Sequence, residues 1–404
     1  MTQSDGTSSK VTRWTYLETG EVESITLAHG TADATTITLG YDAARRLTRI
    51  TDGLGNYIEY RLDTGGNRLE ENIHDATGLL RRAMRQTFDR YNNIDLVSRA
   101  NEAMDYDMAP DGTLHRQTSG KGDVTKFDYD SLKRLLASTQ DLGGLNAQTV
   151  YGYDVADRIA RVTDPEHGST SYVYDDLGNL LTTTSPDAGT TVYSHDAAGN
   201  IMARTDGREQ QFSYRYDELN RLTLLDAPGT AQDIAYEYDN CTNGIGRLCR
   251  LTMGSSTVTY HYDAYGNVTA HQQADYTYDS ADRLKTITYP STAVITYHHD
   301  AAGQVSKVEL EADGKSSTLA GDIAYAPFGG IARLVYGNGK ILSQGYDSAY
   351  RMTAQRVPAV LGFDYLSYDA NGNLGQLDDA IEGGGSLYSY DQLNRLDLAG
   401  GPFG

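Results

Sequence analysis

The sequence predicts an all-β protein in which antiparallel hairpins repeat along the chain and coil into a wide spiral sheet, as a hollow β-shell or a partial shell. Three observations predict it. An aromatic–aspartate pair recurs about every 21 residues, the residues before each pair alternate in polarity, and a turn-forming residue follows each pair. The composition agrees, because the 404 residues include 31 Tyr and 42 Gly but only 6 Phe and 1 Trp.

The repeat is defined by aligning the chain on the aspartate that follows an aromatic residue or its replacement. The clean copies are those of Asp42, Asp63, Asp89, Asp130, Asp154, Asp175, Asp196, Asp217, Asp263, Asp279, Asp300, Asp347, Asp369 and Asp391. Asp239 starts a further copy with the insertion NCTNGI, and Asp107 starts another, in which Pro110 is expected to break the turn open. The sequence therefore predicts irregular strands over residues 1–35 and one continuous repeat array over 36–404, without an internal domain boundary.

The first strand of each copy lies just before the aspartate. In TVTYHYD, Val258, Tyr260 and Tyr262 fall on one face and the residues between them on the other, which is the period of a half-buried strand. Tyrosine suits such a surface, because it has an apolar ring and a polar tip. The tyrosines predicted to precede a structural turn are Tyr41, Tyr153, Tyr174, Tyr216, Tyr262, Tyr278, Tyr368 and Tyr390.

The turn begins at the aspartate, whose side chain can accept hydrogen bonds from backbone amides ahead of it. The third residue after it is expected to be left-handed, which Gly, Asn and Asp tolerate best. One of these three stands there in 11 of the 14 clean copies; Arg45, Lys133 and Tyr350 are the exceptions, with strained or differently shaped turns expected. The remaining predicted turn residues are Asp42, Asp154, Asp175, Gly178, Asp196, Gly199, Asp217, Asn220, Asp263, Gly266, Asp279, Asp300, Gly303, Asp369, Gly372, Asp391 and Asn394.

The return strand begins five residues after the aspartate, where an aliphatic residue or Met stands in every clean copy except at Arg68. This residue is expected to start the strand on its packed face. A looser second turn closes each unit, as in TDGLGN at 51 and TDPEHG at 163. The units give about 30 strands in a ribbon of about 145 Å, which must coil because strands twist. No helix is predicted, even for LLRRAMRQ near residue 79.

The unit Y-x-Y-D-x-x-G-N-L, followed by T-D-x-x-G, resembles the YD repeat of the rearrangement hotspot (Rhs) and teneurin family. The wording PFG…YGNG…YD..YR within residues 325–352 resembles a late segment of bacterial Rhs proteins, and NGIGRL at 243 is a further phrase of the family. The resemblance implies a non-enzymatic shell that encloses or carries a polypeptide toxin or effector for secretion or interbacterial competition. It also implies a secreted or cell-surface location and contact with other shell segments.

The end of the sequence departs from the family pattern. The chain stops at DLAGGPFG, without the DPxGL-like segment at which such shells cleave themselves and without a variable domain after it. Self-cleavage and toxin activity are therefore not carried over. The expectation is a shell section that is truncated, or a subunit or fragment of a longer product.

Catalysis at the Tyr–Asp pairs is not expected. Neighbouring strand residues such as Tyr262 and Asp263 point to opposite faces, and a catalytic constellation is normally single rather than repeated. His195 and His299 occupy the tyrosine position and are predicted to be tyrosine replacements, so HHD at 298–300 is not predicted to bind a metal. No enzyme activity, cofactor or metal site is predicted, although scattered Ca²⁺ binding at acidic turns is kept as an alternative.

Two further motifs are weaker still. DGKSS at 313 lacks the earlier glycine and the βαβ context of a phosphate loop, and DANGN at 369 lacks the spacing and distal Glu of a calcium loop. Both are predicted to be turns. The principal alternative function is a cell-surface protein that binds carbohydrate or mediates adhesion, because Tyr-rich hairpins also occur in cell-wall-binding repeats. A β-solenoid enzyme is a third interpretation, disfavoured because it would need long buried apolar runs.

The net charge of −21 makes duplex nucleic acid an improbable partner and suggests that a shell would hold a basic cargo. The N-terminus has no apolar segment typical of a secretory signal peptide, and no apolar run is long enough for a membrane helix. Cys241 and Cys249 could pair across a turn in an oxidising compartment. Free thiols are favoured, because one close pair is no disulfide framework.

Overall fold

The computed structural model describes residues 2–4, 9–229, 232–271 and 274–401. Its regular elements are β-strands. The described residues contain no helix that is long and apolar enough to cross a membrane. The contacts divide the chain into two compact units. Unit 1 comprises residues 1–124 and 276–404, and unit 2 comprises residues 125–275. Residues 80–86 of LLRRAMRQ lie in a strand, which confirms that this stretch is not helical.

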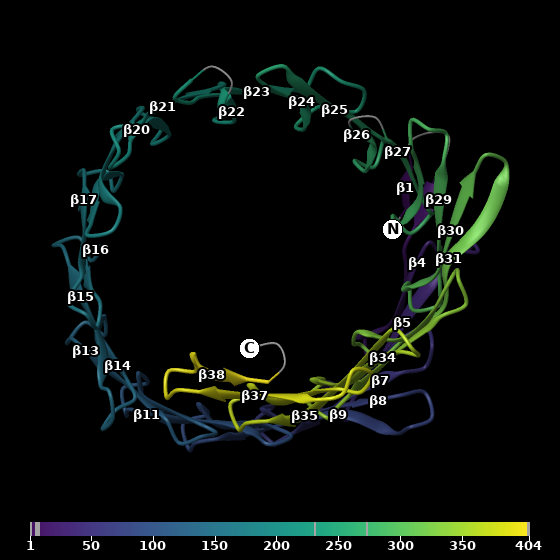
Figure 1. The fold of residues 1–404 in the computed structure, drawn as a ribbon, viewed down its shortest axis with the longest axis horizontal. Coiled ribbons are helices and arrows are strands. Elements are labelled where there is room, and N and C mark those ends of the chain that lie inside the picture. Colours follow the sequence, from purple (N-terminus) through teal and green to yellow (C-terminus); the bar gives the residue numbers. More distant parts are fainter. Residues whose placement is uncertain (1, 5–8, 230–231, 272–273, 402–404) are drawn as a thin grey trace. The chain divides into compact units, whose positions relative to one another are not determined.

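The strands follow the chain in order (Figure 1). The first part of unit 1 contains β1 (Thr2–Ser4), β2 (Ser9–Val11), β3 (Arg13–Tyr16), β4 (Val22–Leu27), β5 (Thr35–Tyr41), β6 (Leu47–Thr51), β7 (Tyr57–Leu62), β8 (Arg68–His74), β9 (Leu80–Phe88), β10 (Ile94–Arg99), β11 (Glu102–Met108) and β12 (Leu114–Ser119). Its second part contains β28 (Leu284–Thr288), β29 (Val294–His299), β30 (Val305–Ala312), β31 (Lys315–Tyr325), β32 (Ile331–Tyr336), β33 (Ile341–Tyr346), β34 (Met352–Val357), β35 (Leu361–Tyr368), β36 (Leu374–Asp379), β37 (Gly385–Tyr390) and β38 (Leu396–Gly400).

Unit 2 is a strip of consecutive strands. It contains β14 (Leu135–Gln140), β15 (Ala147–Tyr153), β16 (Ile159–Thr163), β17 (Ser169–Tyr174), β18 (Leu180–Ser185), β19 (Gly189–His195), β20 (Ile201–Thr205), β21 (Gln211–Tyr216), β22 (Leu222–Asp226), β23 (Ile234–Tyr238), β24 (Leu248–Met253), β25 (Ser256–Tyr262) and β26 (Val268–His271). The strands β13 (Val124–Tyr129) and β27 (Ala274–Tyr278) contain the two junctions between the units.

Consecutive strands pair antiparallel, as the alternating sequence pattern predicts. The pairing runs through β3–β12, β13–β27 and β28–β38, while β1 pairs with β2. The strands β1 to β4 lie in the segment 1–35, where irregular strands are predicted. The all-β fold of repeated antiparallel hairpins is confirmed.

The strand number exceeds the expected value of about 30 because some copies lack the aspartate. Leu17, Ala109 and Ala326 each start a turn with the same two backbone hydrogen bonds as the aspartate copies. Asp107 lies in β11, so its assignment as the start of a turn is wrong. Pro110 does not break this turn, because it occupies the second position, where a fixed φ is favourable.

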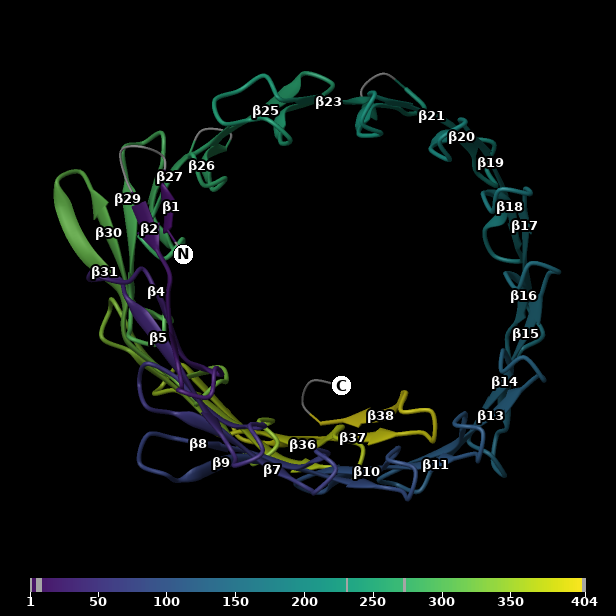
Figure 2. The ribbon, with the colours of Figure 1, turned by 180° about the vertical axis from the view of Figure 1, so that it is seen from behind.

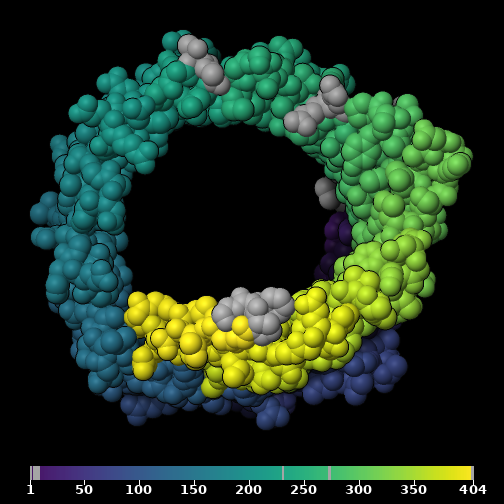
Figure 3. Space-filling view, viewed as in Figure 1, coloured from purple at the N-terminus to yellow at the C-terminus, as the bar shows by residue number. Residues whose placement is uncertain are grey.

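The later repeats of unit 1 lie beside the earlier ones. Both ribbon views place β7–β9 alongside β34–β36 (Figure 1, Figure 2). In the space-filling view the yellow atoms of the last strands abut the blue atoms of the early strands (Figure 3). The backbone amide of Ala83 donates a hydrogen bond to the carbonyl of Ser348 at 3.3 Å. The strip therefore coils back onto its own beginning within this unit, as a spiral sheet requires.

The sheet buries only a small part of its surface. The accessible surface is 23211 Å², whereas a compact monomer of 44.1 kDa would expose about 15,000 Å². A buried core cluster consists of Leu334, Leu342 and Val357, and among the described residues Ile73 is the largest side chain that is almost fully buried. Some residues at the start of return strands stay exposed, namely Ile94, Ile159 and Leu396, so their expected packing is wrong. Because its buried core is small, the sheet must be stabilised by other contacts between its repeats.

Candidate functional site

The repeated turn is the most conspicuous constellation in the molecule, and the Asp263 copy shows its construction. The Asp263 Oδ1 atom accepts the backbone N–H groups of Tyr265 and Asn267, each at 2.9 Å. The Gly266 amide donates to the Asp263 carbonyl at 3.1 Å, and the Asp263 amide donates to the Asn267 carbonyl at 2.9 Å. The aspartate therefore holds the turn rather than facing its neighbouring tyrosine.

The other predicted turn aspartates occupy the same position. Each forms the same pair of backbone hydrogen bonds with the third and fourth residues after it, at Asp42, Asp154, Asp175, Asp196, Asp217, Asp279, Asp300, Asp369 and Asp391. The third residue has a positive φ at Gly178, Gly199, Asn220, Gly303, Gly372 and Asn394. These residues lie at separate turns and do not gather into one pocket.

The three exceptional turns have the ordinary shape. Arg45, Lys133 and Tyr350 have φ values of 63°, 63° and 64°, and each donates its amide to the aspartate carbonyl as in the other copies. The expectation of a differently shaped turn is therefore wrong. The left-handed conformation costs free energy for such side chains, so these turns carry strain that the rest of the fold must offset.

Some second turns are not looser than the first. The turns that start at Asp52, Asp75, Asp164 and Asp206 form the same two backbone hydrogen bonds as the turns after the Tyr–Asp pairs. Below, the turns after the pairs and their equivalents are called YD turns, and the turns at the opposite ends of the strands are called return turns. Both kinds can use an aspartate carboxylate to fix the loop.

The fourth residue after the aspartate is a functional position that the sequence reading missed. It is Arg or Asn in every clean copy except that of Asp300, where it is Gln304. The side chain donates to the second carboxylate oxygen of the same aspartate, from Arg46 at 2.8 Å and from Asn67 at 2.9 Å. A count of residue types at this position would have revealed the signal.

This fourth residue also ties each repeat to the next. Arg158 binds Asp154 and donates to the carbonyl of Asp175 at 2.8 Å, while its guanidinium lies 4.7 Å from the ring centroid of Tyr174. Where the residue is Asn, it can reach the next turn directly, as Asn200 does to Asn220 at 2.8 Å. Neighbouring copies are therefore joined by polar and cation–π contacts in addition to the strand ladder.

The tyrosine before the aspartate continues this linkage. Its hydroxyl donates to the carbonyl of the residue that starts the return strand of the preceding copy. The pairs of donor and acceptor include Tyr41–Val22, Tyr153–Leu135, Tyr174–Ile159, Tyr238–Leu222, Tyr262–Leu248, Tyr325–Val305, Tyr346–Ile331 and Tyr368–Met352. Burial raises the pKa of the Tyr216 phenol, whose ring lies at the same repeat position.

The turn geometry predicts a loss of stability in strong acid. Backbone hydrogen bonds from the fourth residue lower the pKa of Asp42, Asp130 and Asp217. A lowered folded pKa stabilises the protein above the ordinary Asp pKa of about 4, and this stabilisation is lost as the pH falls through the folded values. We expect the urea concentration at the midpoint of unfolding to decrease as the pH is lowered below about 4. A midpoint that stays constant into this range would contradict the role assigned to the carboxylates.

Unit 1 uses the same turns to join its two parts. The YD turns of residues 279–391 contact the return turns of residues 28–123, and we call this line of contact the seam. Arg351 binds the Glu102 carboxylate and the Asn101 side-chain oxygen, both at 2.8 Å. Asn371 binds Asp123 at 3.3 Å. The seam is thus largely polar.

Backbone atoms approach closely at the seam. A Cβ atom added to Gly53 would lie 2.0 Å from the carbonyl oxygen of Ala301, and one added to Gly120 would lie 2.1 Å from that of Ala370. Ala301 and Ala370 hold the same position, directly after the turn aspartate. The two glycines therefore admit the carbonyl of a docked YD turn.

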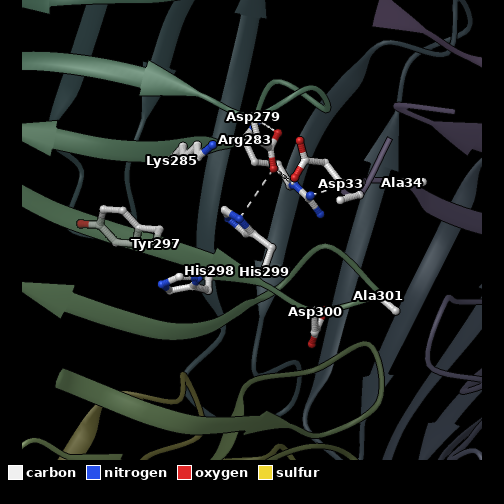
Figure 4. Close-up of a pocket in the computed structure, with 11 residues that line it drawn as sticks. Asp33, Ala34, Asp279, Arg283, Lys285, Tyr297, His298, His299, Asp300 and Ala301 are labelled. Atoms are coloured by element: carbon white, nitrogen blue, oxygen red, sulfur yellow. Dashed lines mark hydrogen bonds and ion pairs between the residues drawn. The ribbon is translucent and has the colours of Figure 1, made fainter. Parts of the chain in front are cut away.

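The seam contains a pocket of about 350 Å³ (Figure 4). Asp279, with 4% of its side chain exposed, accepts the Nε–H of Arg283 at 2.6 Å. Arg283 also donates to the carbonyl of Asp33 and to the hydroxyl of Thr35, at 3.0 and 3.1 Å. His299 takes the tyrosine position of its copy and places Nδ1 3.7 Å from the Asp279 carboxylate.

The other candidate motifs behave as turns or as strand residues. His298 points to Glu309, at 2.7 Å, rather than joining His299, and the described residues contain no group of three or more potential metal-ligating side chains. In DGKSS, Asp313 and Gly314 have positive φ values between the paired residues Ala312 and Lys315. DANGN at 369 is the YD turn of its copy.

The two cysteines form a disulfide, so the preference for free thiols is wrong. Cys241 and Cys249 have a Cα–Cα distance of 5.6 Å and bracket the enlarged turn of the Asp239 copy. A Cβ atom on Gly244 would lie within 2.5 Å of both sulfurs. The path of the inserted loop, in which Gly244 lies against both sulfurs, brings the cysteines together. The spacing of the cysteines alone does not reveal this path.

Replacing both cysteines with serine should destabilise unit 2 by about 2.5 kcal/mol, because the disulfide closes a short loop in the unfolded chain. Urea unfolding followed by hydrogen exchange of β23–β25 would measure the loss. Reduction of the unaltered protein should have the same effect, while reduction of the double variant should have none. Equal stability of the oxidised protein and the double variant would refute the prediction.

Two family models match the sequence. The teneurin YD-shell model matches residues 88–269, and the RHS repeat model matches residues 278–316. Among curated proteins, no sequence matches the chain significantly. Both family matches concern the repeats whose turns and strands are described above.

Solved structures share the fold. The crystal structure of TcdB2-TccC3 is similar with a TM-score of 0.74 and 15% identity, over 97% of this chain and 24% of the other. The crystal structure of TcdB2-TccC3-Cdc42 gives 0.65 and 15%, over 91% and 24%. The Tc holotoxin pore of Photorhabdus luminescens gives 0.64 and 16%, over 91% and 24%. The chain thus spans about a quarter of the length of these chains.

Proposed function

Since the chain is a YD-repeat protein of the RHS and teneurin YD-shell type, we propose that it is a non-enzymatic section of shell wall that encloses or carries a polypeptide cargo. One observation carries the proposal. The side chains that the repeat preserves, namely the tyrosine, the aspartate and the Arg or Asn after it, bind the turn itself and the adjacent copy. In the described copies these groups are used in contacts between turns and neighbouring repeats, which supports a wall rather than a repeated acid–base site.

The same contacts favour a wall over a carbohydrate-binding surface. A sugar platform needs accessible aromatic rings with polar groups free to bind hydroxyls. Here the hydroxyls of Tyr153 and Tyr238 donate to backbone carbonyls, and the guanidiniums of Arg134 and Arg221 lie over their rings. Carbohydrate binding and adhesion are thus outcomes to test rather than the preferred function.

Secretion or surface display is part of the proposal. The disulfide between Cys241 and Cys249 supports it, because such bonds persist mainly in oxidising compartments. The toxin-complex structures with the same fold also support it. A role in interbacterial competition, contact with other shell segments and a basic cargo are finer parts of the proposal. We also propose that residues 36–404 act as one continuous repeat array.

Protease protection would test the wall function. An unstructured reporter polypeptide fused after Gly404 should be digested more slowly than the same reporter added as a separate chain. A matched fusion that carries Gly53→Ala and Gly120→Ala should lose this protection, because the added methyl groups would clash with backbone carbonyls across the seam. Equal digestion in all three samples would refute enclosure. Tyr-dependent binding on a glycan array without protection would instead support the carbohydrate-binding alternative.

A further inference from the structure

His299 makes one part of the seam unlike the rest. In other copies the tyrosine at this position reaches the start of the preceding return strand, as Tyr325 reaches the carbonyl of Val305 at 3.0 Å. The shorter imidazole instead turns toward Asp279 beside an open pocket (Figure 4). Its side chain is only 10% exposed. A titratable ring thus replaces a neutral phenol where the two parts of unit 1 meet.

The groups around His299 come from every element that lines the pocket. The loop between β4 and β5 contributes Asp33, and the turn before β28 contributes Asp279 and Arg283. The remaining charged or titratable lining groups are Lys285 of β28, Tyr297 and His298 of β29, and Asp300 of the next turn.

Arg283 is the cation that couples the ring to the seam. It binds Asp279 on its own turn and the carbonyl of Asp33 across the seam. In addition, the backbone amide of Ser280 donates to the Asp33 carboxylate at 3.0 Å. A second cation beside Asp279 would compete with Arg283 for the same carboxylate and would repel the guanidinium.

We propose that His299 is an acid-sensitive element of the seam, and that protonation of its ring weakens the contact between the turn at 279–283 and the loop at 28–34. The pocket gives solvent a route to the ring, and the shared Asp279 carboxylate transmits the new charge to Arg283. The rest of the seam has no buried histidine among its bridging contacts at Arg351, Asn371 and Gly120.

The direction of the pH effect follows from the pKa of His299. Burial lowers this pKa, and the Arg283 charge lowers it further, against opposing contributions from the surrounding carboxylates. An opened seam exposes the ring and restores its ordinary pKa of about 6.5, so the open form binds the proton more readily. The seam is therefore fully stable above this value and weakens as the pH falls below it. Asp33 stays ionised there, since the hydrogen bond from Ser280 lowers its pKa.

Hydrogen exchange of the full chain at pH 7.5 and 5.0 tests the proposal. After correction for the intrinsic exchange rate, protection of the Ser280 amide should fall at pH 5.0 by up to about 30-fold in the unaltered protein. The variant His299→Tyr, which restores the usual repeat residue, should keep its protection, and so should His299→Gln. The proposal would be overturned if these variants lost as much protection of the Ser280 amide at pH 5.0 as the unaltered protein. It would also be overturned if the unaltered protein lost none.

Two control variants separate the effect of His299 from those of His195 and His298. His195 also occupies a tyrosine position but lies in unit 2, so His195→Tyr should retain the full acid response at Ser280. His298→Gln should retain it as well, because His298 binds Glu309 rather than Asp279. Loss of the response in either control would assign the acid sensitivity elsewhere and overturn the proposal.

Discussion

Gly53→Ala is expected to open the seam of unit 1 where the turn at residues 300–304 docks. The added Cβ would lie 2.0 Å from the carbonyl oxygen of Ala301. This distance is too short for two non-bonded atoms, so the backbone would have to move. Gly53 has no left-handed φ, so the methyl group causes its effect through this contact alone. We expect the free energy of unfolding of unit 1 to fall by about 3 kcal/mol, the upper range for overpacking. Gly120→Ala should act similarly against Ala370.

The fluorescence of Trp14 provides the measurement. This residue, the sole tryptophan of the chain, lies in β3 and reports on unit 1 during urea unfolding. The matched control is Gly321→Ala in β31 of the same unit, where the new Cβ would meet the Thr318 Cγ2 atom at an ordinary 3.4 Å. If Gly53→Ala and Gly321→Ala had equal effects, close backbone docking at the seam would not contribute to stability.

The turns could be predicted from the sequence because their determinants are local. An aspartate and a residue that tolerates positive φ lie within four positions of one another, and both requirements follow from backbone geometry. The starts of the return strands follow equally well, even at Arg68, which begins β8. Tyr350 adopts the same left-handed turn conformation despite the strain this causes. Local residue preference alone would have predicted a different turn at this position.

The role of the fourth residue was visible in the sequence but was not recognised. Arg and Asn differ in charge and size, so their alternation hides a shared property, which is an N–H group that reaches the aspartate. Copies with Leu17, Ala109 or Ala326 in place of the aspartate were missed for the opposite reason, because the backbone keeps the turn without the side chain.

The seam could not be predicted from a single sequence. Its partners are separated by about 250 residues, as for Arg351 and Asn101, and no local pattern sets the register between distant repeats. Gly53 and Gly120 look like ordinary turn glycines until the docked carbonyls are seen. The disulfide was ambiguous for a related reason, since the path of the inserted loop between Cys241 and Cys249 decides it.

Arg351→Ala is expected to have the second large effect on stability. This side chain is 16% exposed and binds Asp347 within its turn and Glu102 across the seam. Its guanidinium also lies 4.5 Å from the ring centroid of Tyr368 in the next copy. Removal of the guanidinium leaves two half-buried carboxylates without their cation, which should cost about 3 kcal/mol. Urea unfolding monitored by Trp14 fluorescence would measure this loss.

Arg395→Ala isolates the part of this effect that belongs to the seam. Arg395 holds the same repeat position and donates to Asp391 at 2.7 Å, but its side chain is 68% exposed, so its loss should cost at most about 1 kcal/mol. A double-mutant cycle of Arg351→Ala with Glu102→Ala should then give a coupling energy of about 1 kcal/mol or more. Additive effects, or equal losses at Arg351 and Arg395, would show that the turn aspartate alone accounts for this arginine. A measured coupling would show instead that one repeat position both fixes a turn and joins distant parts of the sheet.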